Sequence, residues 1–195
     1  MKQWRVDGVP GDDVLDELAS ILIAGVALLP TDTIYGLHAL ATNQHAVDRI
    51  AAMKERPSDK AFVVIAASVE QLAAMGVTVP DVLRSIWPAP LTAILRSGET
   101  TVAARVPDLD WLRGLLDRTG PLVSTSANRS GEAPITLPEM LDPAMKNSLD
   151  ALLDQGRHDG KPSTIVDFTG SEPRMVREGD SGFTQILRKT LWKDL

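Results

Sequence analysis

Three polar clusters in this sequence combine residue types that could hold a charged ligand. The first is Pro30-Thr31-Asp32-Thr33-Ile34-Tyr35-Gly36, which follows an apolar run and contains the only tyrosine. A loop that leaves the carboxyl end of a buried strand is where open α/β sheets build ligand sites. The same residues also suit a capped turn, in which Thr31 and Asp32 satisfy nearby backbone groups. The pattern alone leaves both interpretations open.

The second cluster places two cations, Lys54 and Arg56, directly before Pro57. Pro57 disfavours helical geometry at Arg56, and in an extended segment residues two apart share a face. A helix that ends here would therefore leave both cations facing one cleft. The compact charge of lysine and the two-pronged donor of arginine suit a polyphosphate. By itself the motif fits a solvated helix end better, because cations also suit the helix dipole there.

The third cluster is Ser124-Thr125-Ser126-Ala127-Asn128-Arg129-Ser130-Gly131, which follows the apolar pair at residues 122–123. Such a loop can present backbone N–H groups and small hydroxyl donors to phosphate oxygens. An ordinary polar turn is the alternative. The density of small polar groups directly after an apolar pair favours a ligand site.

Composition excludes several classes of protein. The chain has 195 residues, 44% of them hydrophobic and 24% charged, which predicts one ordinary globular domain over residues 1–195. It has no cysteine, which excludes disulfide scaffolds, thiolate metal sites and a cysteine nucleophile. The net charge of −6 excludes a strongly basic nucleic-acid coat but leaves room for a local basic cleft.

Common catalytic, metal and targeting signals are missing from the sequence. It has no G-x-G-x-x-G or G-x-S-x-G motif, and Gly156 to Lys161 is one residue too short for a P-loop. The three histidines lack metal-ligand spacing, so we expect no protein metal site. No apolar signal core precedes the globular part, and the longest apolar stretch, residues 19–30, is too short to cross a bilayer. We therefore expect a cytoplasmic protein without membrane segments.

Hydrophobic periodicity predicts alternating helices and strands. Asp12 and Asp13 can cap the first helix and Asn43 the second, while Ser68 and Gln71 form a candidate capping box for the third. Strands on either side of Gly98 suggest an antiparallel hairpin and hence a mixed sheet. Residues 126–138 are interpreted as a working loop or lid. Further helices are expected at 80–87, 109–118 and 183–190, and strands at 26–29, 61–66, 92–96, 101–106, 122–125, 151–154, 163–168 and 174–177.

Four further motifs accompany the three clusters in a fixed order along the chain. The set is the clusters at 30–37, 54–57 and 124–131, together with Trp87-Pro88-Ala89-Pro90-Leu91-Thr92, Ala104-Arg105-Val106-Pro107, Pro162-Ser163-Thr164-Ile165-Val166-Asp167 and Val176-Arg177-Glu178-Gly179. This ordered set, which covers nearly the whole chain, resembles the YrdC-like family of threonylcarbamoyl-adenylate synthases in its minimal, single-domain form.

The resemblance implies a twisted, open α/β sheet, flanked by helices, with a large positively charged central cleft. It also implies a reaction in which L-threonine, bicarbonate and ATP give threonylcarbamoyl-AMP and pyrophosphate. The product would serve N6-threonylcarbamoylation of adenosine 37 in tRNA through a separate transferase machinery. Magnesium is expected with the triphosphate, held by substrate oxygens and water.

The resemblance also assigns roles to residues. Lys54 and Arg56 would hold the triphosphate and stabilise charge at the α-phosphorus as the catalytic pair. Further nucleotide contacts are implied for Thr92, Ser126, Asn128 and Arg177, and threonine contacts for Thr33, Arg105, Ser124 and Ser163.

The sequence departs from the family pattern in two places, and two other functions stay open. Ala61-Phe62 and Ile65 replace the usual Pro-Leu and a later histidine, and residues 154–160 contain fewer glycines than usual. One alternative is a YrdC-like paralogue that acts on another carbamoyl donor. The other is an RNA-binding or ribosome-maturation module, which the negative net charge disfavours.

Overall fold

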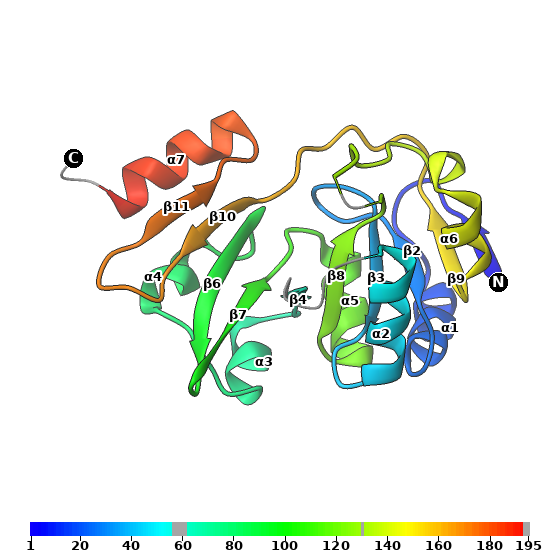
Figure 1. Ribbon diagram of the computed structural model, residues 1–195, viewed down its shortest axis with the longest axis horizontal. Helices are drawn as coiled ribbons and strands as arrows, with labels where there is room; N and C mark the ends of the chain where they lie inside the picture. Colours follow the sequence, from blue (N-terminus) through cyan, green and yellow to red (C-terminus); the bar gives the residue numbers. More distant parts are fainter. Residues whose placement is uncertain (56–61, 130, 193–195) are drawn as a thin grey trace.

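The computed structural model describes residues 1–55, 62–129 and 131–192. Their strands form a single mixed sheet of eleven strands, with helices packed against it (Figure 1). The strands are β1 (Lys2–Arg5), β2 (Ala27–Leu29), β3 (Gly36–Leu40), β4 (Val63–Ile65), β5 (Val77–Thr78), β6 (Leu91–Ser97), β7 (Thr100–Arg105), β8 (Leu122–Ser126), β9 (Ala151–Asp154), β10 (Thr164–Asp167) and β11 (Arg174–Arg177). The helices are α1 (Asp12–Leu22), α2 (Gln44–Met53), α3 (Val69–Ala74), α4 (Asp81–Ile86), α5 (Asp110–Thr119), α6 (Pro143–Asn147), α7 (Ser181–Leu191) and a short 3-10 turn at Pro138–Met140.

The strand order brings distant parts of the sequence together. It runs β1-β9-β2-β3-β8-β4-β7-β6-β10-β11, with β5 beside β6. The sheet contains both parallel pairs, such as β4 with β7, and antiparallel pairs, such as β6 with β7. The predicted mixed α/β sheet is therefore confirmed, as is the hairpin around Gly98, in which Ser97 pairs with Thr100. The loops after β2 and β8 and the segment before β10 thus come from three separate regions of the chain.

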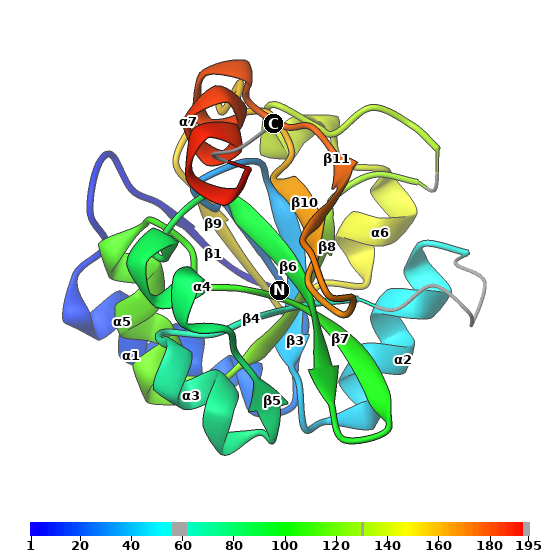
Figure 2. The same ribbon diagram turned by 90° about the vertical axis from the view of Figure 1, so that its left-hand side faces the viewer.

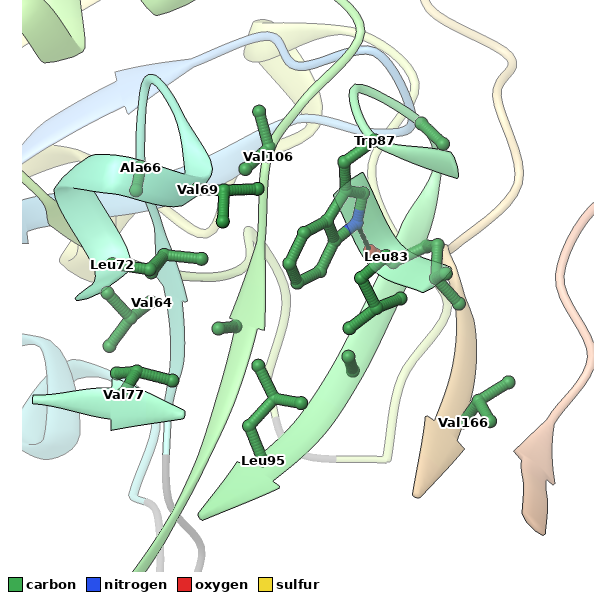
Figure 3. Packing of buried hydrophobic residues seen from close by; sticks show 14 of the residues in the cluster. Val64, Ala66, Val69, Leu72, Val77, Leu83, Trp87, Leu95, Val106 and Val166 are labelled. Atoms are coloured by element: carbon green, nitrogen blue, oxygen red, sulfur yellow. Dashed lines mark hydrogen bonds between the residues drawn. The ribbon is translucent and has the colours of Figure 1, made fainter. Parts of the chain in front are cut away.

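Three hydrophobic clusters hold helices against the sheet. One lies between α1, α5 and β2, one between α2, α6 and β3, and the third between α3, α4, α7 and the pair β6 and β7. Figure 2 shows α1 and α5 on one side of the sheet and α2 and α6 on the other. In the third cluster Trp87 lies beside Leu83 (Figure 3) and donates from Nε1 to the carbonyl oxygen of Leu91 at 2.9 Å. Leu91, Ala93 and Leu95 of β6 belong to this cluster, so the alternate residues Thr92 and Ile94 point to the opposite face.

Helix capping is partly as predicted. The side chains of Asn43 and Ser68 accept hydrogen bonds from the N–H groups of Ala46 and Gln71, as expected. The prediction for the first helix was wrong, because Gly11 is its N-cap. Asp12 and Asp13 lie in the first turn instead, where a carboxylate still suits the positive end of the helix dipole.

The sequence interpretation missed three strands and one helix. β1 and β5 are short, β3 begins at Gly36 inside a polar motif, and α6 spans only five residues. Residues 127–129 and 131–137 lie outside helices and strands, in agreement with the prediction of a loop in this region. In the described part of the chain, no helix has both the length and the apolar character needed to cross a membrane.

Candidate functional site

A cleft of about 460 Å³ lies at the centre of the sheet. Its walls come from the loop after β2, from β4, β6, β7 and β8, from the loop after β8, and from the segments around β10 and β11. Of the ten residues predicted for the site, eight line this cleft: Thr33, Thr92, Arg105, Ser124, Ser126, Asn128, Ser163 and Arg177. The strand order explains the convergence, since β3, β8, β4, β7, β6 and β10 are consecutive neighbours in the sheet.

The remaining two predicted residues are the cations of the second cluster. Lys54 directly follows α2 and is buried, with 3% of its surface exposed. Its Nζ donates to the carbonyl oxygens of Ser126 and Asn128 at 2.5 Å each and to Oδ1 of Asn128 at 3.2 Å. Lys54 therefore lies behind the loop that follows β8, whose residues line the cleft. Arg56 lies outside the described residues.

Arg105 is the centre of a buried polar group at one wall. Its Nη1 donates to Oγ1 of Thr33 at 2.9 Å, and its Nη2 forms an ion pair with Oδ1 of Asp32 at 3.2 Å. Thr31 and Thr33 share a hydrogen bond at 2.9 Å between their hydroxyl groups. Burial lowers the pKa of Arg105, and the charge of Asp32 opposes that shift. The group ties the loop after β2 to the end of β7, so Asp32 serves the site by supporting Arg105.

A second polar group joins β6 to the segments around β10 and β11. The hydroxyls of Thr92 and Ser163 lie 2.8 Å apart. Arg177 donates from Nη2 to the carbonyl oxygen of Ser163 at 2.9 Å. Burial and the positive charge of Arg105 both lower the pKa of Arg177, burial more strongly. Two guanidinium groups thus face the same cleft, where an anionic ligand would relieve their repulsion.

The end of β8 and the loop after it supply small polar side chains to another wall of the cleft. The Oγ of Ser126 donates to Oδ1 of Asn128, whose amide in turn donates to the backbone oxygen of Glu132. Among the described lining residues, Glu132 adds one negative charge to the two positive charges of Arg105 and Arg177. The described lining therefore has a net positive charge in a protein with a negative total.

Two buried residues next to the cleft, Tyr35 and His38, have no role among the site residues predicted from the sequence. Tyr35 is buried and fixes the segment after β9: its hydroxyl donates to the carbonyl oxygen of Gly156 at 2.8 Å and accepts from the N–H of Gln155 at 3.1 Å. His38 contacts Ser124 from beneath the cleft, with Nε2 and Oγ 3.1 Å apart. Tyr35 is the only tyrosine and lies in a motif that was singled out, so that signal was visible. No sequence signal connects His38 to Ser124, because their contact depends on strand register.

Gly160 is a further position where the site depends on backbone contact. A side chain there would place its first carbon 1.6 Å from the carbonyl oxygen of Thr33. The segment between β9 and β10 therefore passes directly over the loop after β2, and only glycine fits at the crossing. In the described residues, no three His, Cys, Asp or Glu side chains lie close enough together to hold a metal ion.

Comparisons with known proteins identify relatives of this chain. Residues 21–179 match the family model that groups Sua5, YciO and YrdC, whose description reads "Telomere recombination". A threonylcarbamoyl-AMP synthase of Marinobacter nauticus is 33% identical over 174 residues, which cover 80% of this chain and 91% of that protein. A threonylcarbamoyl-AMP synthase of Bacillus subtilis is 30% identical over 207 residues, covering 95% of this chain and 60% of that protein. The chain therefore spans only part of its longer relatives.

Solved structures agree with this relationship. Pyrococcus abyssi Sua5, crystallised in complex with L-threonine, has a TM-score of 0.88 and 27% identity, and the match covers 98% of this chain and 61% of that chain. Escherichia coli YciO has a TM-score of 0.79, covering 91% of this chain and 94% of that chain; at 24% identity it shows the fold alone. With 159 of its 195 residues inside the family model, the chain belongs to the Sua5/YciO/YrdC family.

Proposed function

We propose that this protein is an L-threonylcarbamoyl-adenylate synthase, a nucleotidyltransferase that supplies the activated group for modification of adenosine 37 in tRNA. The observation that carries the proposal is the convergence of eight predicted residues, from widely separated motifs, on one cleft. Two relatives named threonylcarbamoyl-AMP synthase are 33% and 30% identical to this chain, over 80% and 95% of its length. The complex of Pyrococcus abyssi Sua5 with L-threonine supports threonine as one substrate.

The proposed reaction needs no protein nucleophile. The amine nitrogen of threonine attacks the carbon of bicarbonate, and a hydroxide leaves with a proton as water, which gives a carbamate. A carbamate oxygen then attacks the α-phosphorus of ATP, and the bond to the β-phosphate breaks to release pyrophosphate. The chain has no cysteine, and the described lining contains hydroxyl, amide and guanidinium donors. Such donors act by positioning the reactants and by stabilising charge on oxygen atoms.

We assign the nucleotide to the walls formed by Thr92, Ser126, Asn128 and Arg177. The guanidinium of Arg177 is anchored by Ser163 and lines the cleft, which suits contact with an anion. Lys54 and Arg56 are proposed to hold the triphosphate. Lys54 already binds the backbone of Ser126 and Asn128, so its charge lies directly behind the loop that would face the nucleotide.

We assign the threonine and carbamate group to Thr33, Arg105, Ser124 and Ser163. Arg105 is fixed from two sides by Thr33 and Asp32, which prepares its planar guanidinium for a carboxylate. The hydroxyl of Ser124 lies at the floor of the same cleft. These groups suit an amino acid whose carboxylate, amine and hydroxyl all need partners.

Magnesium is proposed only as a companion of the triphosphate. The described carboxylates do not form a three-ligand cluster, so substrate oxygens and water would supply most of its ligands. We also propose that residues 1–195 form one YrdC-like domain, which the single continuous sheet supports, and that the protein works in the cytoplasm.

The test is a reaction with ATP, L-threonine and bicarbonate, followed by measurement of pyrophosphate. Pyrophosphate release that depends on threonine supports the synthase. Release only with another carbamoyl donor would support the paralogue instead. Tight binding of RNA without any turnover would support the RNA-binding module and contradict the proposal.

A further inference from the structure

A buried histidine lies directly beneath the cleft and contacts it through one hydroxyl group. His38 on β3 is completely buried, and its Nε2 lies 3.1 Å from the Oγ of Ser124 on β8. The register pairs these two residues across the strands, so both side chains leave the sheet on the same face. Ser124 lines the cleft, whereas the described lining does not include His38. Any influence of the ring on a ligand therefore passes through Ser124.

The position of the ring depends on the glycine two residues before it. A methyl group at Gly36 would lie 2.9 Å from Cε1 and 3.3 Å from Nε2 of His38. Contacts that short would displace the ring. The imidazole of His38 therefore fits in its position because Gly36 has no side chain. The ring is held between the backbone of Gly36 and the hydroxyl of Ser124, which fixes its direction.

The ring is neutral at physiological pH. Burial lowers the pKa of His38 to about 3, the nearby charge of Arg105 acts in the same direction, and the smaller effect of the Gly36 backbone opposes both. A ring with so low a pKa is a poor general base near pH 7, and His38 does not line the cleft. Its hydrogen bond to Ser124 is the contribution that the geometry supports.

A neutral imidazole carries its proton on one nitrogen, and the surroundings of His38 select which one. Nδ1 has no hydrogen-bond partner of good geometry among the described residues. A buried N–H without a partner is rarer in proteins than an acceptor without one. The proton therefore belongs on Nε2, which donates to the Oγ of Ser124. The hydrogen of the Ser124 hydroxyl then points away from the ring and toward the cleft.

We infer that His38 is a positioning residue that holds the Ser124 hydroxyl as a hydrogen-bond donor toward a carboxylate or carbamate oxygen of the ligand. A hydroxyl oriented this way gives a charge-assisted hydrogen bond to an anionic oxygen. The identity of the ligand rests on the proposed function. The contact between His38 and Ser124 and the choice of nitrogen do not rest on it.

Nitrogen-15 NMR of the histidine rings tests the hydrogen bond in the unmodified protein. The His38 signal is identified by its absence from the spectrum of His38→Gln. We expect a neutral ring protonated on Nε2 that does not titrate between pH 8 and pH 5, and a shift of its Nε2 signal on addition of L-threonine. A proton on Nδ1, or titration near pH 6.5, would overturn the inference.

Kinetics test the consequence for the ligand. His38→Leu removes the donor, and we expect the KM for threonine to rise about tenfold, the usual value of one hydrogen bond. His38→Gln keeps an N–H donor and should restore most of the loss. In the double variant with Ser124→Ala, His38→Leu should add nothing, because the ring acts only through Ser124. Independent, additive effects of the two substitutions would contradict the proposal.

A matched control shows whether the effect on the KM is specific to His38 or follows from replacing any histidine by leucine. His45 is exposed on α2, and His45→Leu should leave the KM for threonine unchanged. Should His38→Leu fail to fold, the NMR result and the kinetics of His38→Gln decide the question. If the wild-type protein releases no pyrophosphate with threonine, the proposed function fails. The NMR experiment still tests the hydrogen bond between His38 and Ser124 in that case.

Discussion

At the scale of single residues, buried charge is concentrated at the cleft. Arg105 and Lys54 are almost fully buried, and both bind the loops that form the cleft walls. Lys54 holds the backbone after β8, and Arg105 holds the loop after β2. Because each cation has fixed partners on the protein, each one links the stability of the fold to the shape of the site.

Replacing Arg105 should destabilise the fold as well as the site. In Arg105→Leu the carboxylate of Asp32, itself buried, would lose its ion-pair partner. Removing one member of a buried pair costs about 3–5 kcal/mol. Urea unfolding measures this loss, and the double variant Asp32→Asn with Arg105→Leu should recover part of it. A double variant that is less stable than Arg105→Leu would contradict the ion-pair account.

Removing the cations of the second cluster should reduce turnover, and Lys54→Ala should also destabilise the loop after β8, whose carbonyl oxygens Lys54 binds. We expect Lys54→Ala and Arg56→Ala to lower the rate of threonine-dependent pyrophosphate release on the order of 100-fold, as for other charge-stabilising groups. Lys189→Ala, on an exposed position of α7, is the control and should keep full activity. Unchanged turnover in both test variants would remove these residues from the proposed mechanism.

His38 should make the fold sensitive to acid. The unfolded ring takes up a proton near pH 6.5 and the folded ring only near pH 3, so the unfolded state binds more protons between these values. Stability from this group is complete above about pH 6.5 and falls as the pH drops toward 3. Between pH 7 and pH 5 the loss should be about 2 kcal/mol in the free energy of unfolding. Urea unfolding at both pH values should show a smaller loss in His38→Gln; equal losses would contradict the assignment.

At the scale of elements, the connection from β9 to β10 joins the two halves of the sheet. This segment arches from β9 across the top of the molecule to β10 (Figure 1). Tyr35 binds its beginning through Gln155 and Gly156, and Gly160 crosses the backbone of Thr33. The loop after β2 is thus held from above by this connection and from the side by Arg105.

A side chain at the crossing should disturb this arrangement. Gly160→Ala would force the two backbones apart, and overpacking of this kind costs about 1–3 kcal/mol. We also expect a higher KM for threonine, because Thr33 lines the cleft. Gly170→Ala is the matched control, since its new methyl group would meet its nearest atom at 3.7 Å. Thermal unfolding that is identical for the two variants would show that the crossing is not tight.

Elements with a strong local pattern were predictable, and those defined by distant pairing were not. β9 and β11 were predicted with the bounds they have, because both are compact runs between turn residues. β1 is mostly exposed and becomes a strand by pairing with β9, about 150 residues away. β3 was missed because its first residue belongs to a polar motif, although its pairing with β8 builds the floor of the site.

The candidate site was predictable as a set of residues and not as an arrangement. Motif order pointed to Thr33, Ser124 and Arg177, which line the cleft. Which side chains touch depends on strand order and register, as in the pair of Thr92 and Ser163, 71 residues apart. The hydrogen bonds of Lys54 to the backbone after β8 and the contact of His38 with Ser124 also join residues far apart in the sequence. No local sequence pattern predicts such contacts.

At the scale of the whole molecule, an acidic protein builds a locally positive cleft. The net charge is −6, yet the described lining has two arginines and one glutamate. The arginines come from β7 and β11, which lie on either side of β6 and β10 in the sheet. An anionic substrate is therefore compatible with the acidic total, because short-range interactions in the cleft outweigh distant, screened charges.

The most direct test of the account follows labelled carbon from bicarbonate. The protein is incubated with ATP, L-threonine and carbon-13 bicarbonate, and the products are analysed by mass spectrometry alongside a pyrophosphate assay. We predict pyrophosphate together with an equal amount of an adenylate that contains the labelled carbon and the threonine, and neither product when threonine is omitted. Pyrophosphate formation that does not depend on threonine, or an adenylate without the labelled carbon, would contradict the account.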